Sequence, residues 1–339
     1  MWQDRRFLDL VGIEIPIVQA PMAGSVSSEM VVAVSEAGGL GSLPCAMLNA
    51  EQIRTELGII RQRTARPINV NFFCHAPPQR DARREAAWKE RLAPYYAELG
   101  IDPDAQPSGS ARAPFDDAMC DAVLEFRPEV VSFHFGLPDQ RLLRRVKESG
   151  AKVLSSATSV AEARALEAQG CDAIIAQGYE AGGHRGMFLT DDIASQAGTM
   201  ALVPQVVDAV GVPVIAAGGI ADGRGIVAAL ALGASAVQIG TAYLFCPEAK
   251  VGAAHRAALK SANESATVLT NVFTGRPARG IVNRIVREVG PMSQDAPAFP
   301  LAATGVGPLR SKVRGRRLGR LHPLVVGPGG RPWARASGR

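Results

Sequence analysis

The chain alternates short, continuously apolar stretches with longer stretches whose apolar residues recur at helical spacing. A strand buried on both faces of a parallel sheet gives such a continuous run, and the alternation indicates repeated βα units. The pattern predicts eight strands, at 17–22, 40–44, 68–73, 130–135, 152–157, 173–177, 214–218 and 236–240. It predicts helices at 27–37, 50–64, 138–149, 160–169, 200–210 and 223–232, with start signals at Ser159 and Asp222.

Eight such units favour a closed TIM-like (βα)8 barrel over residues 1–246 rather than an open sheet. No G-x-G-x-x-G sequence follows the first predicted strand, which also argues against a Rossmann domain. Two regions do not fit the repeat. Residues 74–121 contain a charged helix at 81–92 and a polar patch at 103–114, and we interpret them as an insertion after strand three. Residues 247–310 form a C-terminal extension, and the two regions together are expected to cap the barrel mouth.

Composition narrows the class of protein. The chain is 47% hydrophobic and 20% charged, which is ample for a large core. No apolar run reaches the length of about 18 residues that a membrane helix needs, and the N-terminus lacks the apolar stretch of a signal peptide. The five cysteines are scattered without a CxxC pair, so we expect reduced thiols, no metal site and a cytoplasmic protein.

The net charge of +5 is carried by the C-terminus. From Arg310 onward there are nine Lys or Arg and no Asp or Glu, so residues 1–309 carry a net charge of −4. The main part of the chain is mildly acidic, and nucleic acid is therefore not an expected partner.

The segment Gln177–Gly186 carries the strongest chemical signal. It follows the apolar run 173–176 and so lies at the carboxyl end of a predicted strand, where barrels hold their active sites. Gly182 and Gly183 let backbone N–H groups approach a phosphate or a planar ring, and His184 can exchange a proton near neutral pH. A glycine-rich turn with a solvent-facing histidine is the alternative.

Other strand ends support a bound cofactor. The segments 216–220 and 238–241 end the last two strands with glycines and a threonine, the usual phosphate position in barrels. Asn71 and Gln177 place amides at the barrel mouth, either facing a flavin ring or bonded to a neighbouring loop. No strand end carries a Schiff-base lysine, paired carboxylates or a metal cluster, so the chemistry is expected to belong to the cofactor.

With these segments the chain resembles the nitronate monooxygenase family, flavoproteins with a TIM-like barrel that bind FMN. The match runs from the N-terminus to about Arg310, and 273–280 also looks like the family. The resemblance implies that His184 is catalytic. It also implies an FMN site built from Met22, Ala23, Asn71, Gln177, Gly182, Gly183, Gly218, Gly219, Gln238, Ile239, Gly240 and Thr241.

Three other histidines lie near predicted strands or helices. His134 is expected either beside the substrate or as a structural histidine bonded to a loop carbonyl. His75, after strand three, is a weaker candidate. His255 is predicted to lie on a helix surface without a role.

The implied activity is oxidation of alkyl nitronates by O2 through a flavin semiquinone, a form of nitroalkane detoxification. One alternative keeps FMN but uses NAD(P)H to reduce an enoyl thioester or a quinone. Another is a catalytically impaired flavin-binding protein. The sequence leaves open which nitronate is used and whether the chain forms a homodimer.

The C-terminus departs from the family, which usually ends in a sequence like Gly-Ser-Gly-Asp-Phe-Ser-Pro-Leu-Trp-Ser-Gly-Gln. Residues 311–339 are instead rich in Arg, Gly and Pro, and we expect a disordered basic tail. Codons exist for 317–330 that, read one nucleotide later, encode Gly-Ser-Gly-Asp-Phe-Thr-Pro-Trp-Ser-Ser-Gly-Gln-Ala. A frameshift near 311–316 is therefore our hypothesis, and sequencing the locus tests it.

Overall fold

Eight parallel strands form the centre of the protein, as seen in the computed structural model, which describes residues 2, 4–102, 104, 112–262, 266–314 and 324–325. The strands follow the order β1-β9-β8-β6-β5-β4-β3-β2, and a parallel bridge between Val18 and Leu40 joins the two ends into a barrel. Their bounds are β1 Ile17–Gln19, β2 Gly41–Pro44, β3 Ile68–Phe73, β4 Val130–His134, β5 Lys152–Ala157, β6 Ala173–Gln177, β8 Val214–Ala217 and β9 Ala236–Ile239.

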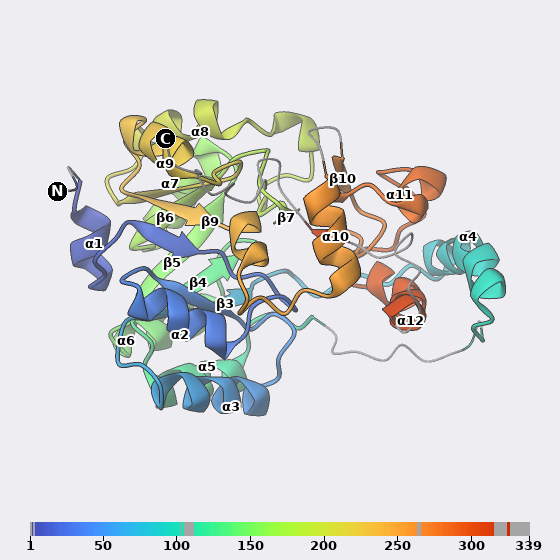
Figure 1. Ribbon diagram of the computed structural model, residues 1–339, viewed down its shortest axis with the longest axis horizontal. Helices are drawn as coiled ribbons and strands as arrows, with labels where there is room; N and C mark the ends of the chain where they lie inside the picture. Colours follow the sequence, from blue (N-terminus) through green and yellow to red (C-terminus); the bar gives the residue numbers. More distant parts are fainter. Residues whose placement is uncertain are drawn as a thin grey trace, which may run out of the picture.

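Helices surround the barrel on its outer face (Figure 1). They are α2 Ser28–Glu36, α3 Ala50–Arg61, α5 Asp117–Phe126, α6 Gln140–Glu148, α7 Val160–Ala168, α8 Thr199–Val207 and α9 Gly223–Ala231. Helix α1 Arg6–Val11 instead packs against a second cluster of strand residues that includes Val18 and Leu40. The predicted start signals are confirmed, because the side chains of Ser159 and Asp222 accept hydrogen bonds from the first turns of α7 and α9. Short 3₁₀ helices lie at η1 Ile193–Ser195 and η2 Thr241–Phe245.

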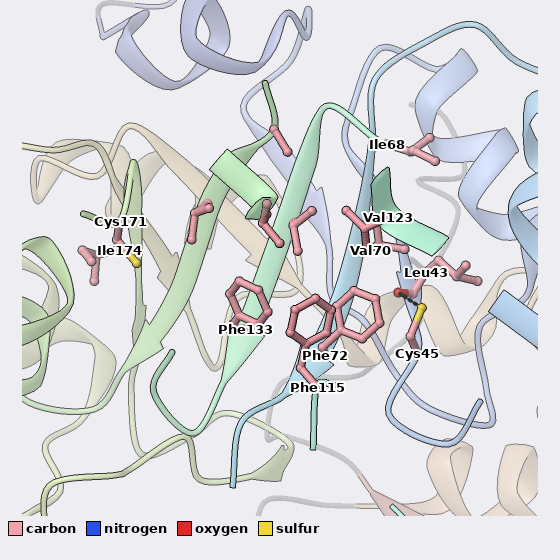
Figure 2. Packing of buried hydrophobic residues seen from close by; sticks show 14 of the residues in the cluster. Leu43, Cys45, Ile68, Val70, Phe72, Phe115, Val123, Phe133, Cys171 and Ile174 are labelled. Atoms are coloured by element: carbon pink, nitrogen blue, oxygen red, sulfur yellow. Dashed lines mark hydrogen bonds between the residues drawn. The ribbon is translucent and has the colours of Figure 1, made fainter. Parts of the chain in front are cut away.

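The main hydrophobic core fills the space between the strands and the outer helices. Figure 2 shows Phe72, Phe115 and Phe133 beside one another, with Val70 and Leu43 nearby. The rings of Phe72 and Phe115 lie 4.6 Å apart and those of Phe115 and Phe133 5.3 Å apart, the spacing of favourable tilted and edge-to-face pairs. The apolar runs of the sequence are therefore buried because both faces of each strand are covered.

A second lobe lies beside the barrel, on the right of Figure 1. It contains α4 Ala82–Leu99, α10 Ala253–Ser261, β10 Thr267–Thr270, β11 Ala278–Ile281, α11 Arg284–Val289 and α12 Ala302–Arg314. Helix α4 belongs to the insertion after β3, yet it packs against α12 and α11 from the other end of the chain. Trp88 Nε1 donates to the carbonyl of Ala302 at 3.2 Å, and the Tyr96 hydroxyl donates to that of Gly305 at 2.6 Å. The insertion and the extension thus share one core.

A two-residue strand connects this lobe to the barrel. Strand β7, Gly183–His184, pairs antiparallel with β11, so that His184 lies opposite Ala278 and Gly183 opposite Arg279. The Arg185 N–H extends the pairing by donating to the carbonyl of Pro277 at 2.9 Å. The glycine-rich loop after β6 is therefore an edge of the second lobe's sheet, and the lobe covers the barrel mouth there.

The eight predicted strands are confirmed, with bounds that differ by no more than a few residues. The pattern missed α1, and it missed α5, which begins at Asp117 inside the region expected as an insertion. Helix α4 runs beyond the predicted 81–92 and continues through Pro94 to Leu99. Among the described residues, no helix is long and apolar enough to cross a membrane.

The segment 311–339 is described only in part. Helix α12 continues to Arg314, and β12 Leu324–Val325 pairs antiparallel with Gly280 and Ile281 of β11. These residues are helix and strand in the structure, and the expectation of a disordered tail stays a prediction for the rest of 311–339, which, with the proposed frameshift, lies outside the described residues.

The shared core of the second lobe can be tested at Leu92, which is 1% exposed. We expect Leu92→Ala to lower the free energy of unfolding by about 2–5 kcal/mol, because the truncation leaves a cavity between α4 and α12. Leu189→Ala is the matched control: Leu189 is 56% exposed, so its truncation should change stability by no more than about 0.5 kcal/mol. Urea unfolding measures both variants, and equal values for the two would contradict the shared core.

Candidate active site

A cavity of about 290 Å³ lies at the carboxyl ends of the barrel strands, between the barrel and the second lobe. The ends of β1, β3, β6, β8 and β9 contribute to its wall from the barrel side, and Thr270, Phe273, Thr274 and the start of β11 contribute from the other. This is the end of a barrel at which enzymes of this fold carry their active sites.

The backbone of His184 is fixed by two side chains from the barrel. Its carbonyl accepts hydrogen bonds from Gln177 Nε2 at 2.9 Å and from His134 Nε2 at 3.2 Å. The Gln177 side-chain oxygen in turn accepts from the Gly186 N–H at 2.8 Å. Both the nitrogen and the oxygen of the Gln177 amide therefore bind the loop 184–186. Of the two partners expected from the sequence, a flavin ring or a neighbouring loop, these contacts favour the loop.

His134 is bonded through both ring nitrogens, since its Nδ1 also lies 3.1 Å from Ser156 Oγ. A carbonyl only accepts, so Nε2 carries the proton and Nδ1 accepts from the serine hydroxyl. Burial, with further help from the positive charges of Arg276 and Arg185, lowers the pKa of His134 to about 4, so the ring is neutral. These contacts favour the structural alternative for His134, although the ring also borders the cavity.

The fully buried guanidinium of Arg185 holds the other side of the loop. It donates to the carbonyls of Gly178 at 2.6 Å and Gln177 at 2.8 Å, and to the side-chain oxygen of Gln196. Gln196 donates to Thr158, whose hydroxyl donates to the buried carboxylate of Glu162 at 2.7 Å. This chain of hydrogen bonds links a buried cation to a buried anion and satisfies both.

The His184 ring lies among aromatic side chains and has one polar partner. Its Nε2 is 2.9 Å from the hydroxyl of Thr274, in the loop before β11. The rings of Phe299, Phe73 and Phe135 have centroids 5.3 to 6.0 Å from the imidazole, all in edge-on arrangements. Nδ1 has no hydrogen bond within the described part of the chain, and His184 borders the cavity.

The charge state of His184 follows from these surroundings. Burial comes first, followed by the positive charge of Arg112, and together with neighbouring histidines and Arg276 they hold the pKa of His184 well below its usual range. The imidazole is therefore neutral at neutral pH. It can donate or accept a hydrogen bond, but it carries no charge.

The ends of β8 and β9 provide a second part of the cavity wall. Gly218 and Gly219 have φ values of +120° and +70°, and a Cβ on Gly218 would lie 2.8 Å from Thr199 Oγ1, so the turn requires glycine. The side-chain oxygen of Gln238 is buried there without a hydrogen-bond partner among the described residues. The N-terminus of α9 is already capped by the carboxylate of Asp222, so an anion is better placed against the Gly240–Thr241 turn.

The structure brings most of the predicted site residues together. Lining the cavity are Met22, Ala23, Asn71, His134, Gln177, Gly182, Gly183, His184, Gly218, Gly219, Gln238, Gly240 and Thr241. The Ile239 side chain instead lies in the main core, and His75 packs behind the cavity with its ring 4.8 Å from that of Phe299. His255 borders the cavity, whereas the sequence placed it on a helix surface.

Three side chains at the site escaped the sequence-based interpretation: Thr274, Phe299 and Arg112. Thr274 lies in the segment 273–280, whose resemblance to the family indicated that the segment matters but did not assign a role to Thr274. Phe299 and Arg112 come from regions with no strand or helix pattern, and only the fold shows that they approach His184. Phe135 has a φ of +71°, which is unusual for a bulky residue and marks a constrained position beside the same ring.

Comparison with known proteins identifies the family of this chain. The family model described as nitronate monooxygenase matches residues 5–319. A nitronate monooxygenase of Pseudomonas aeruginosa is 45% identical over 305 residues, which is 90% of this chain and 84% of that protein. A nitronate monooxygenase of Paraburkholderia phytofirmans is 43% identical over 300 residues, 88% of this chain and 82% of that protein. The chain belongs to the nitronate monooxygenase family.

Solved structures place this family member among related barrels. The nitroalkane oxidase of Streptomyces ansochromogenes superposes with a TM-score of 0.87 at 40% identity, covering 96% of this chain and 93% of that one. FabK from Thermotoga maritima superposes with a TM-score of 0.72 at 32% identity, covering 96% and 89%. The resemblance seen in the sequence is thus confirmed at the level of the family and the barrel fold.

The neutral histidines predict an acid-sensitive fold. Burial lowers the pKa of His134 to about 4, whereas an unfolded histidine takes up a proton near pH 6.5. The unfolded chain therefore binds more protons below pH 6.5, and the free energy of unfolding must fall there by up to about 1.4 kcal/mol per pH unit for each such histidine. Urea unfolding of the wild type and His134→Gln at pH 7.5 and 5.5 measures this. The free energy of unfolding should fall less steeply with decreasing pH in the variant, by the equivalent of about one proton. Equal slopes for the variant and the wild type would contradict the assignment.

Proposed function

We propose that this chain is an FMN-dependent oxidoreductase that oxidises alkyl nitronates with O2. The observation that carries the proposal is the placement of His184. Its backbone is held by Gln177 and His134, its ring is held by Thr274, and it faces the cavity of a nitronate monooxygenase family barrel. The names of the relatives and of the Streptomyces neighbour support the same substrate class.

The residues present fit FMN. Gln238 has a buried side-chain oxygen without a hydrogen-bond partner in the described part of the chain, and the turns at Gly219 and Gly240–Thr241 border the same cavity. We propose that these residues hold the phosphate and the polar chain of FMN, with Asn71, Met22 and Ala23 nearer its ring. Bound FMN would supply the electron transfer between the nitronate and O2.

The hydroxyl of Thr274 decides what His184 offers to a ligand. A hydroxyl both donates and accepts, so it can serve either tautomer of the imidazole. When Thr274 donates to Nε2, the proton resides on Nδ1, which can then donate to a nitronate oxygen. When Thr274 accepts from Nε2 and donates to the Arg276 carbonyl at 3.4 Å, Nδ1 can accept the α-proton of a neutral nitroalkane.

The activity itself can be tested with FMN-loaded protein mixed anaerobically with propionate 3-nitronate or with NADH. We expect the flavin spectrum to change with the nitronate, in the manner of one-electron reduction, and to recover when O2 is admitted. Bleaching by NADH with no response to the nitronate would instead support the reductase alternative. If neither the nitronate nor NADH changes the flavin spectrum, the result would support an impaired flavin-binding protein.

His184→Asn tests the named residue, because asparagine keeps a hydrogen-bonding amide but cannot exchange a proton as imidazole does. We expect kcat/KM for the nitronate to fall by roughly a hundredfold or more, the range typical of a lost acid–base group. FMN content, measured by absorbance after gel filtration, should remain within twofold of the wild type, roughly, since the residues proposed to hold FMN are unchanged. Retention of wild-type kcat/KM would overturn the assignment.

Thr274→Val and Thr274→Ser form a matched pair. Valine keeps the shape but removes the hydroxyl 2.9 Å from His184 Nε2, whereas serine keeps the hydroxyl. We expect valine to lower kcat by about tenfold, the effect of one lost hydrogen bond at a reacting group, and serine to stay near the wild type. Steady-state rates measured across roughly pH 6–9, on both sides of neutrality, test this. Equal rates for the two variants would show that the hydroxyl does not position His184.

A further inference from the structure

The cavity wall is cationic or neutral throughout its described residues. Arg112, Arg279 and Arg310 border it, as do three histidines, and no Asp or Glu does so. A cavity with this wall disfavours cations and stabilises anions, because no carboxylate offsets its positive charge. Which of the arginines is available to a ligand depends on the contacts each one makes.

Most buried arginines near the site are occupied by protein groups. Arg185 donates to two carbonyls and to Gln196. Arg279 donates to the Tyr179 carbonyl through two nitrogens, at 3.0 and 3.2 Å, and lies 4.9 Å over the tyrosine ring. Arg276 donates to the Met187 carbonyl at 2.6 Å and lies 4.2 Å from the centre of the Phe135 ring. These guanidiniums hold the loops around the cavity together.

Arg112 differs from these arginines. Its side chain makes one hydrogen bond within the described part of the chain, a long contact of 3.9 Å from Nη2 to the sulfur of Met47, which is a weak acceptor. No carboxylate is paired with it there, and burial alone lowers its pKa. A guanidinium carries five N–H donors, so most of the hydrogen-bonding capacity of Arg112 is unused beside the cavity.

The position of Arg112 places that capacity near the reacting group. Arg112 lies within the insertion, after α4, and borders the cavity with His184. After burial, its charge has the largest effect on the pKa of His184, and it also acts on His75, to which its backbone is hydrogen-bonded. The imidazole is neutral, so a positive charge for an anionic ligand at this end of the cavity must come from an arginine.

We propose that Arg112 binds the nitro-group oxygens of the nitronate, and that this contact makes the enzyme prefer anionic nitronates to neutral nitroalkanes. The inference rests on the proposed function for its substrate. A nitronate has two oxygens on one planar nitrogen and a negative charge, and a guanidinium presents two parallel N–H groups that match such a pair. Arg112 would hold the charge, and His184 Nδ1–H would donate to one of the oxygens.

The test compares Arg112→Gln and Arg112→Lys with the wild type, on ethylnitronate and on neutral nitroethane. We expect Arg112→Gln to raise KM for ethylnitronate by about tenfold or more, since a charge-assisted contact is lost, and to change KM for nitroethane much less. Arg112→Lys keeps the charge but not the paired donors, so its KM for ethylnitronate should lie between the other two. Arg80→Gln is the control, because Arg80 is exposed and paired with Glu85 away from the cavity.

A binding measurement separates this inference from the activity. Nitrate is a planar anion with the shape of a nitronate head, and a ligand that binds the native state raises Tm. Nitrate should raise the Tm of the wild type above the value in chloride at equal ionic strength, and Arg112→Gln should lose this difference. If no protein oxidises ethylnitronate but the nitrate effect depends on Arg112, the anion site stands and the proposed function fails.

Two results would overturn the assignment of Arg112. One is a wild-type KM for ethylnitronate in Arg112→Gln, or in Arg112→Lys if the glutamine variant does not fold. The other is a nitrate effect on Tm that is absent from the wild type or unchanged in the folded variant.

Discussion

The site depends on the double attachment of the short segment Gly183–Arg185. On one side, its backbone pairs with β11 of the second lobe. On the other, the His184 carbonyl is bound by Gln177 and His134, which end β6 and β4 of the barrel. A segment of three residues cannot shift relative to either body without losing hydrogen bonds on that side. The connection between the barrel and the second lobe therefore fixes the position of the His184 imidazole.

The electrostatics of the loop follow from this attachment. A charge as deeply buried as that of Arg185 is costly unless its donors are bonded, and three carbonyl-type oxygens accept from it. The carboxylates of Glu180 and Glu162 both favour its charge, and Glu162 is connected to it by hydrogen bonds through Gln196 and Thr158. Glu162 also accepts hydrogen bonds from the N–H groups of Phe188 and Leu189, so the same network holds the residues that follow the loop 184–186. Arg185 therefore stiffens the loop, and its positive charge is not offered to the cavity.

The part of the fold that could be predicted from the sequence differs between the barrel and the second lobe. The barrel strands are buried on both faces, so each leaves a continuous apolar run, and three of them have the predicted bounds. The helix α4 has no such local constraint: its apolar stripe is buried against α12, more than 200 residues later, and only the fold shows the partner. Helix α5 was missed because its start lies within the charged and polar region that was interpreted as the insertion.

The same division applies to the site. His184 and the glycines follow strands directly, so their place at the barrel mouth can be deduced from their position in the sequence. The role of Gln177 could not be deduced in this way, because an amide at a strand end fits a cofactor or a loop equally well. Only the contacts with His184 and Gly186 show that it binds the loop. Thr274 and Arg112 reach the site through the cap, whose arrangement no local pattern specifies.

The cap and the barrel thus contribute different physical properties to one site. The barrel supplies rigid backbone, glycine turns and histidines that are uncharged because they are buried. The cap lobe supplies the hydroxyl of Thr274, which can adjust to either imidazole tautomer. The positive charge beside them is that of Arg112, which lies after α4 within the insertion. Sequence change in the insertion can therefore alter the charge that the cavity presents without disturbing the hydrogen bonds that hold His184.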